Sequence, residues 1–132
     1  MSIKKIFFMN RWLLVISYAI LIFVLTSVSS LSYPKFGFDP VDKIYHFLVY
    51  AVFSYLLFLA LSQKENRFFK GNPHFFSILL GGAHALGSEL YQISVPGRYC
   101  DFFDFLADFI GVVSVQFFLF VIQRSRKQKV ES

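Results

Sequence analysis

The chain has 132 residues, of which 56% are hydrophobic and 16% are charged. Soluble domains hold roughly 45–50% apolar and about 25% charged residues, and a small soluble fold leaves much of its surface exposed. The composition therefore excludes an ordinary soluble domain and favours a lipid environment. The net charge of +5 would suit nucleic acid or a membrane surface, so the positions of the charges must decide. The single cysteine, Cys100, excludes an internal disulfide.

Four long segments lack Asp, Glu, Lys and Arg, namely 12–34, 44–63, 71–88 and 109–123. About 20 apolar residues make one helical crossing of a bilayer, and the four prolines lie between these segments or at their ends. The sequence therefore predicts an all-α fold, an integral membrane four-helix bundle formed by a single domain over residues 1–132. Its spans are predicted near 11–30, 43–62, 74–93 and 104–123.

The first segment has an alternative interpretation as a secretory signal. Lys4, Lys5 and Arg11 precede it, and Ser27-Val28-Ser29 is an acceptable cleavage site. Because the segment is long enough to cross a bilayer, we interpret it as the first span.

Positively charged residues are sorted along the chain. Ten of the 13 Lys and Arg residues lie in the N-terminal tail, the 62–73 loop and the C-terminal tail, against three in the other two loops. Because cytoplasmic loops carry the excess of Lys and Arg, both the N and C termini are predicted to be cytoplasmic. The basic tail over 124–129 is interpreted as a topology anchor, so no nucleic-acid partner is expected.

Ionisable residues recur at helical spacing near the outer ends of three predicted spans. The three stripes are Asp42–His46–Tyr50, Glu89–Gln92 and Asp104–Asp108. Ionisable groups are costly in lipid, so they should face the bundle interior or a wet cavity. The sequence therefore predicts an acidic ligand-binding pocket at the outer membrane face, formed by Asp42, Lys43, His46, Tyr50, Glu89, Gln92, Arg98, Asp101, Asp104 and Asp108.

The predicted pocket has more acid than base. Five carboxyl groups would face two cations, Lys43 and Arg98, which leaves an excess of three negative charges. In a partly dry site, this excess requires protonated carboxyls, a bound cation or a cationic ligand. No cofactor is predicted otherwise. A divalent cation such as Ca²⁺ or Mg²⁺, held by Glu89, Asp104 and Asp108, is an alternative.

Arg98 follows the turn Pro96-Gly97 and should lie over the outer ends of the helices. A guanidinium group there suits two roles, namely clamping Asp101 and Asp104 or binding a lipid phosphate.

Five further residues receive structural interpretations. His84 lies off the acidic stripe of its helix and is interpreted as packing or as a polar residue satisfied by a hydrogen bond, and His74 receives no role. Tyr50 is either a pocket residue or an aromatic side chain at the membrane interface. Gly81 and Ala85 have the spacing of small residues that let two helices approach closely.

Three motif blocks carry a family resemblance. They are Asp42-Lys43-x-x-His46-Phe47-x-x-Tyr50, Glu89-x-x-Gln92-x-x-x-Pro96-Gly97-Arg98 and Asp104-x-x-x-Asp108-x-x-Gly111. The chain resembles the VanZ-like family of small bacterial membrane proteins, named after a teicoplanin-resistance protein. The resemblance implies a multi-pass protein of the bacterial cytoplasmic (inner) membrane with a role at the cell envelope, including tolerance of glycopeptide antibiotics. Asp108 departs from the family pattern, which usually has Asn, so a mechanism based on amide hydrogen bonding does not carry over.

Three functions fit these observations. The first, which we prefer, is binding of a membrane or envelope lipid, a cell-wall precursor, or a cationic or glycopeptide ligand. The second is an enzyme acting on a lipid-linked phosphate or ester, with His46, Glu89 or Asp104 as the catalytic group. The third is proton-coupled lipid transport by an oligomer. The cytoplasmic halves of the second and fourth spans offer no matching polar trail, which argues against transport.

Overall fold

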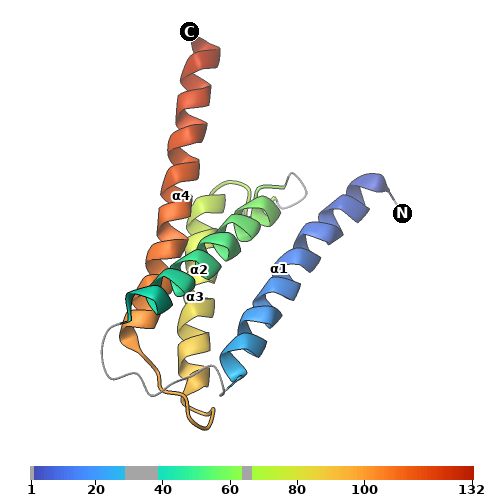
Figure 1. Ribbon diagram of the computed structural model, residues 1–132. Coiled ribbons are helices and arrows are strands. Elements are labelled where there is room, and N and C mark those ends of the chain that lie inside the picture. Colours follow the sequence, from blue (N-terminus) through green and yellow to red (C-terminus); the bar gives the residue numbers. More distant parts are fainter. Residues whose placement is uncertain (1, 29–38, 64–66) are drawn as a thin grey trace.

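The computed structural model consists of helices and describes residues 2–28, 39–63 and 67–132 (Figure 1). These described ranges contain no strand, which confirms the predicted all-α fold. The helices are α1 (Ile3–Ser27), α2 (Pro40–Leu61), α3 (Pro73–Gln92) and α4 (Phe102–Glu131). Ser29 of the alternative cleavage site, and Lys35 and Lys64 of the charge count, lie outside the described residues.

Three helices begin after a residue whose side chain caps them. The Asp39 carboxylate accepts a hydrogen bond from the N–H of Val41 at 3.0 Å, and Pro40 is the first residue of α2. Asn72 caps α3 and Asp101 caps α4 in the same way. Asp and Asn satisfy N–H groups that have no partner within the helix, and a proline at the first position has no N–H to satisfy. These caps fix where α2, α3 and α4 start.

The helix ends differ from the predicted spans in two places. α2 and α3 agree with the prediction to within three residues, whereas α1 begins at Ile3 and α4 continues to Glu131. The helix α4 therefore continues beyond residue 123, where the predicted span ends. The length of an uncharged segment indicates only how much of a helix fits in hydrocarbon. Lys, Arg and Gln are good helix formers, so they can continue the helix into water.

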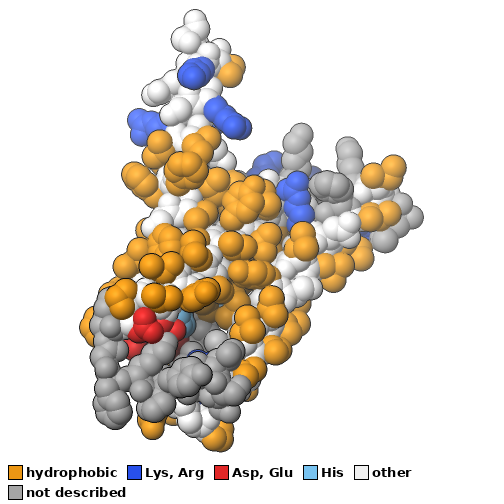
Figure 2. Space-filling view, viewed as in Figure 1, with side chains coloured by type: hydrophobic (Ala, Val, Ile, Leu, Met, Phe, Trp, Pro, Cys, Tyr) orange, Lys and Arg blue, Asp and Glu red, His pale blue; other side chains and the backbone are white. Residues whose placement is uncertain are grey.

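Three helices are long and apolar enough to cross a membrane, over Met9–Ser27, Pro40–Leu61 and Phe102–Glu131. α3 is not one of them, because glycine, serine, histidine and glutamate lower its hydropathy. The polar side chains of α3 include Ser77, Ser88 and Glu89, which are buried against other helices. The outward faces carry many exposed hydrophobic side chains, as expected for a protein in lipid (Figure 2).

α2 and α4 approach each other at a glycine. A Cβ atom on Gly111 would lie 2.4 Å from the backbone oxygen of Phe47, so no larger residue fits without moving a helix. α3 packs on α4 through another glycine, because a Cβ atom on Gly81 would lie 3.0 Å from the Val112 side chain. Ala85 is fully buried. The predicted packing role of Gly81 and Ala85 is therefore confirmed.

α1 packs against α2 and α3. The Tyr18 hydroxyl donates to the Val49 carbonyl oxygen at 3.1 Å, and Arg11 donates to the Leu59 carbonyl oxygen at 3.0 Å. The start of α1 and the end of α4 lie at the end of the molecule away from the loop between α3 and α4 (Figure 1). Acidic side chains gather at one end of the view in Figure 2, and Lys and Arg side chains gather along the last turns of α4 at the other.

Candidate functional site

The candidate site is built around His46 of α2. His46 Nδ1 lies 2.8 Å from Asp108 Oδ1 of α4, so an imidazole and a carboxylate join the two helices. The Asp108 side chain is 1% exposed and that of His46 is 19% exposed. Gly111 lies one turn beyond Asp108 at the close approach of α2 and α4, and that approach brings the two side chains within reach.

The ammonium group of Lys43, also on α2, contacts three carboxylates. Its Nζ lies 2.9 Å from Asp101 Oδ2 and 3.4 Å from Asp42 Oδ2, and it also contacts Asp104 Oδ1. Desolvation raises the pKa of Asp101, but hydrogen bonds from Lys43 and from the N–H of Phe103 outweigh this effect. The pKa of Asp101 therefore lies below its ordinary value, and this carboxyl is ionised at neutral pH.

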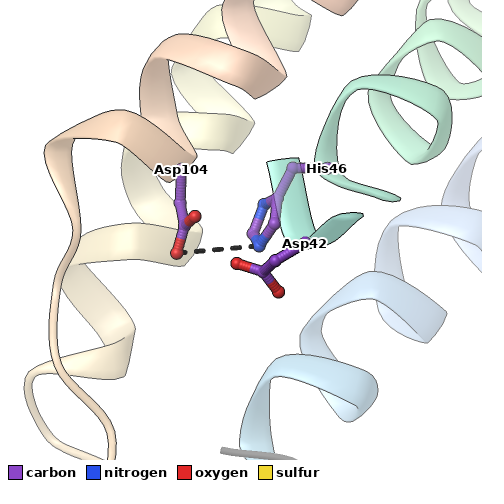
Figure 3. Close-up of side chains that lie close together, drawn as sticks. All are labelled: Asp42, His46 and Asp104. Carbon is purple, nitrogen blue, oxygen red and sulfur yellow. Dashed lines mark ion pairs between the residues drawn. The ribbon is translucent and has the colours of Figure 1, made fainter. Parts of the chain in front are cut away.

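The second nitrogen of His46 faces carboxylates as well. His46 Nε2 lies 3.7 Å from Asp104 Oδ2, and Figure 3 shows Asp42 and Asp104 on this side of the ring. Asp108 lies at the other ring nitrogen. The structure thus brings the predicted stripes of α2 and α4 together around one imidazole.

α3 contributes Glu89 and Gln92, both buried. Glu89 Oε1 accepts a hydrogen bond from Gln92 Nε2, and Glu89 Oε2 accepts one from the backbone N–H of Asp101, both at 3.1 Å. Glu89 therefore links the predicted stripe of α3 to the start of α4.

Tyr50 of α2 is buried inside the helix bundle. Its hydroxyl lies 2.9 Å from His84 Nδ1 and 2.9 Å from Ser88 Oγ. The burial of Tyr50 agrees with its prediction as a pocket residue, and the contact between its hydroxyl and Nδ1 agrees with the interpretation of His84 as a polar residue with a partner. His84 and Ser88 are four residues apart on one face of α3, a spacing that could have revealed their shared direction.

The hydrogen bonds of Arg98 are made to α1 and not to the acidic cluster. Its Nη2 donates to the carbonyl oxygens of Leu25 and Val28, at 3.3 and 3.2 Å, and so holds the C-terminal end of α1. Gly97 before it has φ +78°, a conformation that favours glycine. The predicted clamp on Asp101 and Asp104 is wrong, because the guanidinium donates instead to carbonyl oxygens at the C-terminal end of α1.

The match to a known family extends over nearly the whole chain. The family model described as VanZ/LLP1 matches residues 2–123. The chain belongs to the VanZ/LLP1 family. No curated protein and no solved structure matches it. The matched residues of this VanZ/LLP1 protein include the whole candidate site and confirm the resemblance found in the sequence.

An apolar groove of about 440 Å³ lies between α2 and α4 of this VanZ/LLP1 protein, next to the acidic cluster. Lys43 lines the groove while its ammonium group contacts the carboxylates of the cluster. The other lining residues are Pro40, Ile44, Phe47, Phe103, Leu106, Ala107 and Ile110. The groove is therefore lined by apolar side chains, with Lys43 as its one charged lining residue.

Polar side chains continue into the other half of this VanZ/LLP1 fold. Gln116 of α4 is buried, and its Nε2 donates to the Ser54 carbonyl oxygen at 3.0 Å and to the Ser54 hydroxyl at 2.7 Å. His74 Nδ1 lies 2.9 Å from Gln116 Oε1, and its Nε2 lies 3.2 Å from Gln123 Oε1. The prediction that α2 and α4 offer no polar trail there is therefore wrong, and so is the absence of a role for His74. Serine and glutamine do not interrupt an uncharged segment, so counting charges missed them.

Two groups of three side chains have ligand atoms close enough to share a metal ion. Within the described ranges these groups are Asp42, His46 and Asp104, and His46, Glu89 and Asp108. In each group the three atoms lie within 4.8 Å of one another. The predicted set of Glu89, Asp104 and Asp108 is not one of these groups. The reason is that Asp104 and Asp108 lie at opposite nitrogens of His46.

Proposed function

We propose that this VanZ/LLP1 protein binds an envelope lipid at the outer face of the bacterial cytoplasmic membrane. The observation that carries the proposal is the position of Lys43, which lines the apolar groove and contacts Asp101 and Asp104. An acyl chain in the groove would place its head group at the acidic cluster. Apolar contact alone gives little selectivity inside a bilayer, so the polar cluster must select the head group.

The charge of the cluster indicates the chemistry of the head group. Carboxylates outnumber the single ammonium group that contacts them, so a head group with a positive charge is favoured, or an anionic one bridged by a cation. A lipid amine, an amine of a cell-wall precursor and a basic glycopeptide meet this requirement. Tolerance of teicoplanin would then result from altered access of the drug to its envelope target.

We further propose that all four helices cross the cytoplasmic membrane, with both termini in the cytoplasm. The Lys and Arg residues gathered at the ends of the sequence and in the 62–73 loop support this orientation. α3 can serve as the fourth crossing despite its lower hydropathy, because its Ser77, Ser88 and Glu89 side chains are buried by its neighbours. Polar groups that face the interior of a bundle are tolerated in a membrane span.

A groove-filling variant tests lipid binding. Ala107 lines the groove, whereas Ala83 is exposed on α3, so Ala107→Trp and Ala83→Trp form a matched pair. Purified protein is mixed with phosphatidylethanolamine or phosphatidylglycerol, and the lipid retained by each chain is counted by native mass spectrometry. We expect retention to fall at least fivefold in Ala107→Trp only. Equal retention by both variants and the wild type would refute the groove as the lipid site.

A cellular readout tests the antibiotic role. We expect cells expressing the chain to tolerate more teicoplanin than cells expressing Ala107→Trp, at equal amounts of membrane-inserted protein. Equal susceptibility of the two strains would separate lipid binding from drug tolerance.

A second candidate function, a membrane hydrolase, is favoured by the pairing of His46 with Asp108. When Nδ1–H donates to Asp108, Nε2 carries the lone pair and can accept a proton from water. The resulting hydroxide oxygen would bond to a lipid ester carbon or phosphorus, and the bond to the leaving alcohol would break. The proton held by His46 would then pass to that alcohol.

Product formation distinguishes the hydrolase from a binding protein. Purified protein is incubated with phosphatidylethanolamine, and released head group or fatty acid is measured by mass spectrometry. The hydrolase predicts turnover that falls at least a hundredfold in His46→Gln. Lipid retention without turnover in the wild type would leave binding as the function.

A further inference from the structure

The carboxyl groups around His46 outnumber the cations that contact them. Five carboxyls gather there, those of Asp42, Glu89, Asp101, Asp104 and Asp108. The ammonium group of Lys43 contacts three of them. Arg98, the other cation expected in the pocket, instead donates to carbonyl oxygens at the end of α1. The acidic excess is therefore larger than the sequence indicated, and it is greatest on the buried side.

We propose that His46, Glu89 and Asp108 bind one divalent first-row metal ion, such as Mn²⁺ or Zn²⁺. One nitrogen or oxygen from each side chain lies within 4.8 Å of those of the other two. The three residues come from α2, α3 and α4, and the two carboxylates are buried. The proposal depends on this cluster alone and does not depend on lipid binding.

A buried oxygen without a partner points to a ligand. Asp108 Oδ2 is buried and has no hydrogen-bond partner, whereas Oδ1 of the same carboxyl lies 2.8 Å from His46 Nδ1. A buried carboxylate oxygen without a partner is costly, and a cation would satisfy it.

The contacts of Glu89 prepare it for the same role. Its two oxygens accept hydrogen bonds from Gln92 Nε2 and from the N–H of Asp101, which fix the orientation of the carboxylate. A carboxylate oxygen has two lone pairs, so each still has one to offer. Metal-binding carboxylates commonly have such supporting hydrogen bonds.

The second group, Asp42, His46 and Asp104, is the weaker candidate. Figure 3 shows its side chains converging, but Lys43 Nζ contacts Asp42 Oδ2 and Asp104 Oδ1. An ammonium group already compensates these carboxylates and would repel a metal ion. All three residues are also more exposed than Glu89 and Asp108.

The ligand set indicates the class of ion. One imidazole and two carboxylates suit Mn²⁺, Zn²⁺ or Fe²⁺, whereas Ca²⁺ takes six to eight oxygen ligands. Compared with the set predicted from sequence, the proposal keeps Glu89 and Asp108 and exchanges Asp104 for His46.

Metal titration tests the proposal with the full chain in detergent. After treatment with EDTA, Mn²⁺ is added and the free ion is followed by electron paramagnetic resonance. The number of bound ions per chain is then measured by plasma mass spectrometry, with Zn²⁺ as a competitor. We expect one ion per chain, and affinity at least tenfold lower in both Glu89→Gln and Asp108→Asn.

Two kinds of control make the result specific. Asp42→Asn and Asp104→Asn remove the same charge from the other group and should change affinity by less than threefold. Glu131→Gln, on the exposed last turn of α4, controls for net charge alone. Circular dichroism identifies any variant that has lost its helices, and His46→Gln, which removes the imidazole ligand, then replaces that variant in the comparison.

The outcomes decide the proposal. Absence of Mn²⁺ and Zn²⁺ binding to the folded wild type would overturn it. Loss of affinity in Asp42→Asn and Asp104→Asn, with none in Glu89→Gln, would also overturn it and assign the ion to the other group. Lipid retention is measured separately, so failure of one proposal is distinguishable from failure of the other.

Discussion

His46 Nδ1 of α2 lies 2.8 Å from Asp108 Oδ1 of α4. When Nδ1–H donates to this carboxylate, Nε2 presents its lone pair to the more open side of the cluster. Hydrolysis and metal binding therefore make different demands on one pair of side chains. Hydrolysis needs the pair intact, whereas a metal ion bound between His46 and Asp108 would replace their hydrogen bond. Both demands require α2 and α4 to pack closely at this point.

Gly111→Ala should push α2 and α4 apart. Its Cβ would lie 2.4 Å from the Phe47 backbone oxygen, which cannot move without its helix. We expect the free energy of unfolding in mixed micelles to fall by about 1–3 kcal/mol, and lipid retention to fall with it. Gly87→Ala is the control, because nothing lies within 4 Å of a Cβ there. It should be neutral or stabilise α3 by up to about 1 kcal/mol.

Ser54 and Gln116 should be energetically coupled, because Gln116 Nε2 donates to both the hydroxyl and the carbonyl oxygen of Ser54. A double-mutant cycle with Ser54→Ala and Gln116→Leu should give a coupling of about 0.6 kcal/mol or more, as for hydrogen bonds between membrane helices. The matched cycle pairs Gln116 with Ser125, whose hydroxyl donates to Val121 O within α4. Equal coupling in the two cycles would contradict the interhelical role of Gln116.

Cys100 reports the orientation of the protein, because it is exposed between α3 and α4. If both termini are cytoplasmic, a membrane-impermeant maleimide should label Cys100 in intact cells. In Cys100→Ser/Ser132→Cys, labelling should appear only after the cells are permeabilised. The opposite pattern would reverse the proposed topology.

The rate of this labelling should also depend on pH. Desolvation and the carboxylates of Glu89, Asp101 and Asp104 raise the pKa of the Cys100 thiol above its ordinary value. A raised pKa means less thiolate at neutral pH, so Cys100 should react more slowly than the Ser132→Cys thiol in permeabilised cells. The difference should narrow as the pH rises toward the higher pKa.

Arg98→Lys should loosen the end of α1. The guanidinium of Arg98 donates hydrogen bonds to the carbonyl oxygens of Leu25 and Val28. The ammonium group of a lysine at this position is smaller and more strongly hydrated, so it should bind these oxygens less well. We expect amide hydrogen exchange over residues 24–28 to accelerate severalfold. Arg67→Lys, in an exposed loop, should leave that exchange unchanged.

Most of the fold could be predicted from the sequence because it depends on local rules. Uncharged segments located the helices, and Asp39-Pro40 and Asn72-Pro73 mark the starts of α2 and α3. The length of α4 was missed because charged residues continue a helix beyond the hydrocarbon. The lower hydropathy of α3 results from polar residues that other helices bury, which depends on tertiary packing.

The candidate site was predicted only as far as helical spacing allows. A stripe predicts that Asp104 and Asp108 share a direction, and the structure brings both to His46. Spacing cannot say which neighbour a side chain meets, because that depends on the order and rotation of the helices. The spacing of His84 and Ser88 shows that they share a direction, but not that they meet Tyr50, and the contact of Arg98 with α1 has no signal in the sequence.

The length of α4 has an electrical consequence. One continuous helix has Asp104 in its first turn and Lys129 in its last, and Arg124, Arg126 and Lys127 lie between them toward its C-terminal end. In the proposed orientation, its basic end lies on the negative side of an energised membrane. Moving one unit charge across such a membrane costs about 2.3 kcal/mol per 100 mV. In that proposed orientation, the voltage of a living cell would hold α4 upright with its carboxylates outward, an aligning force that a detergent micelle lacks.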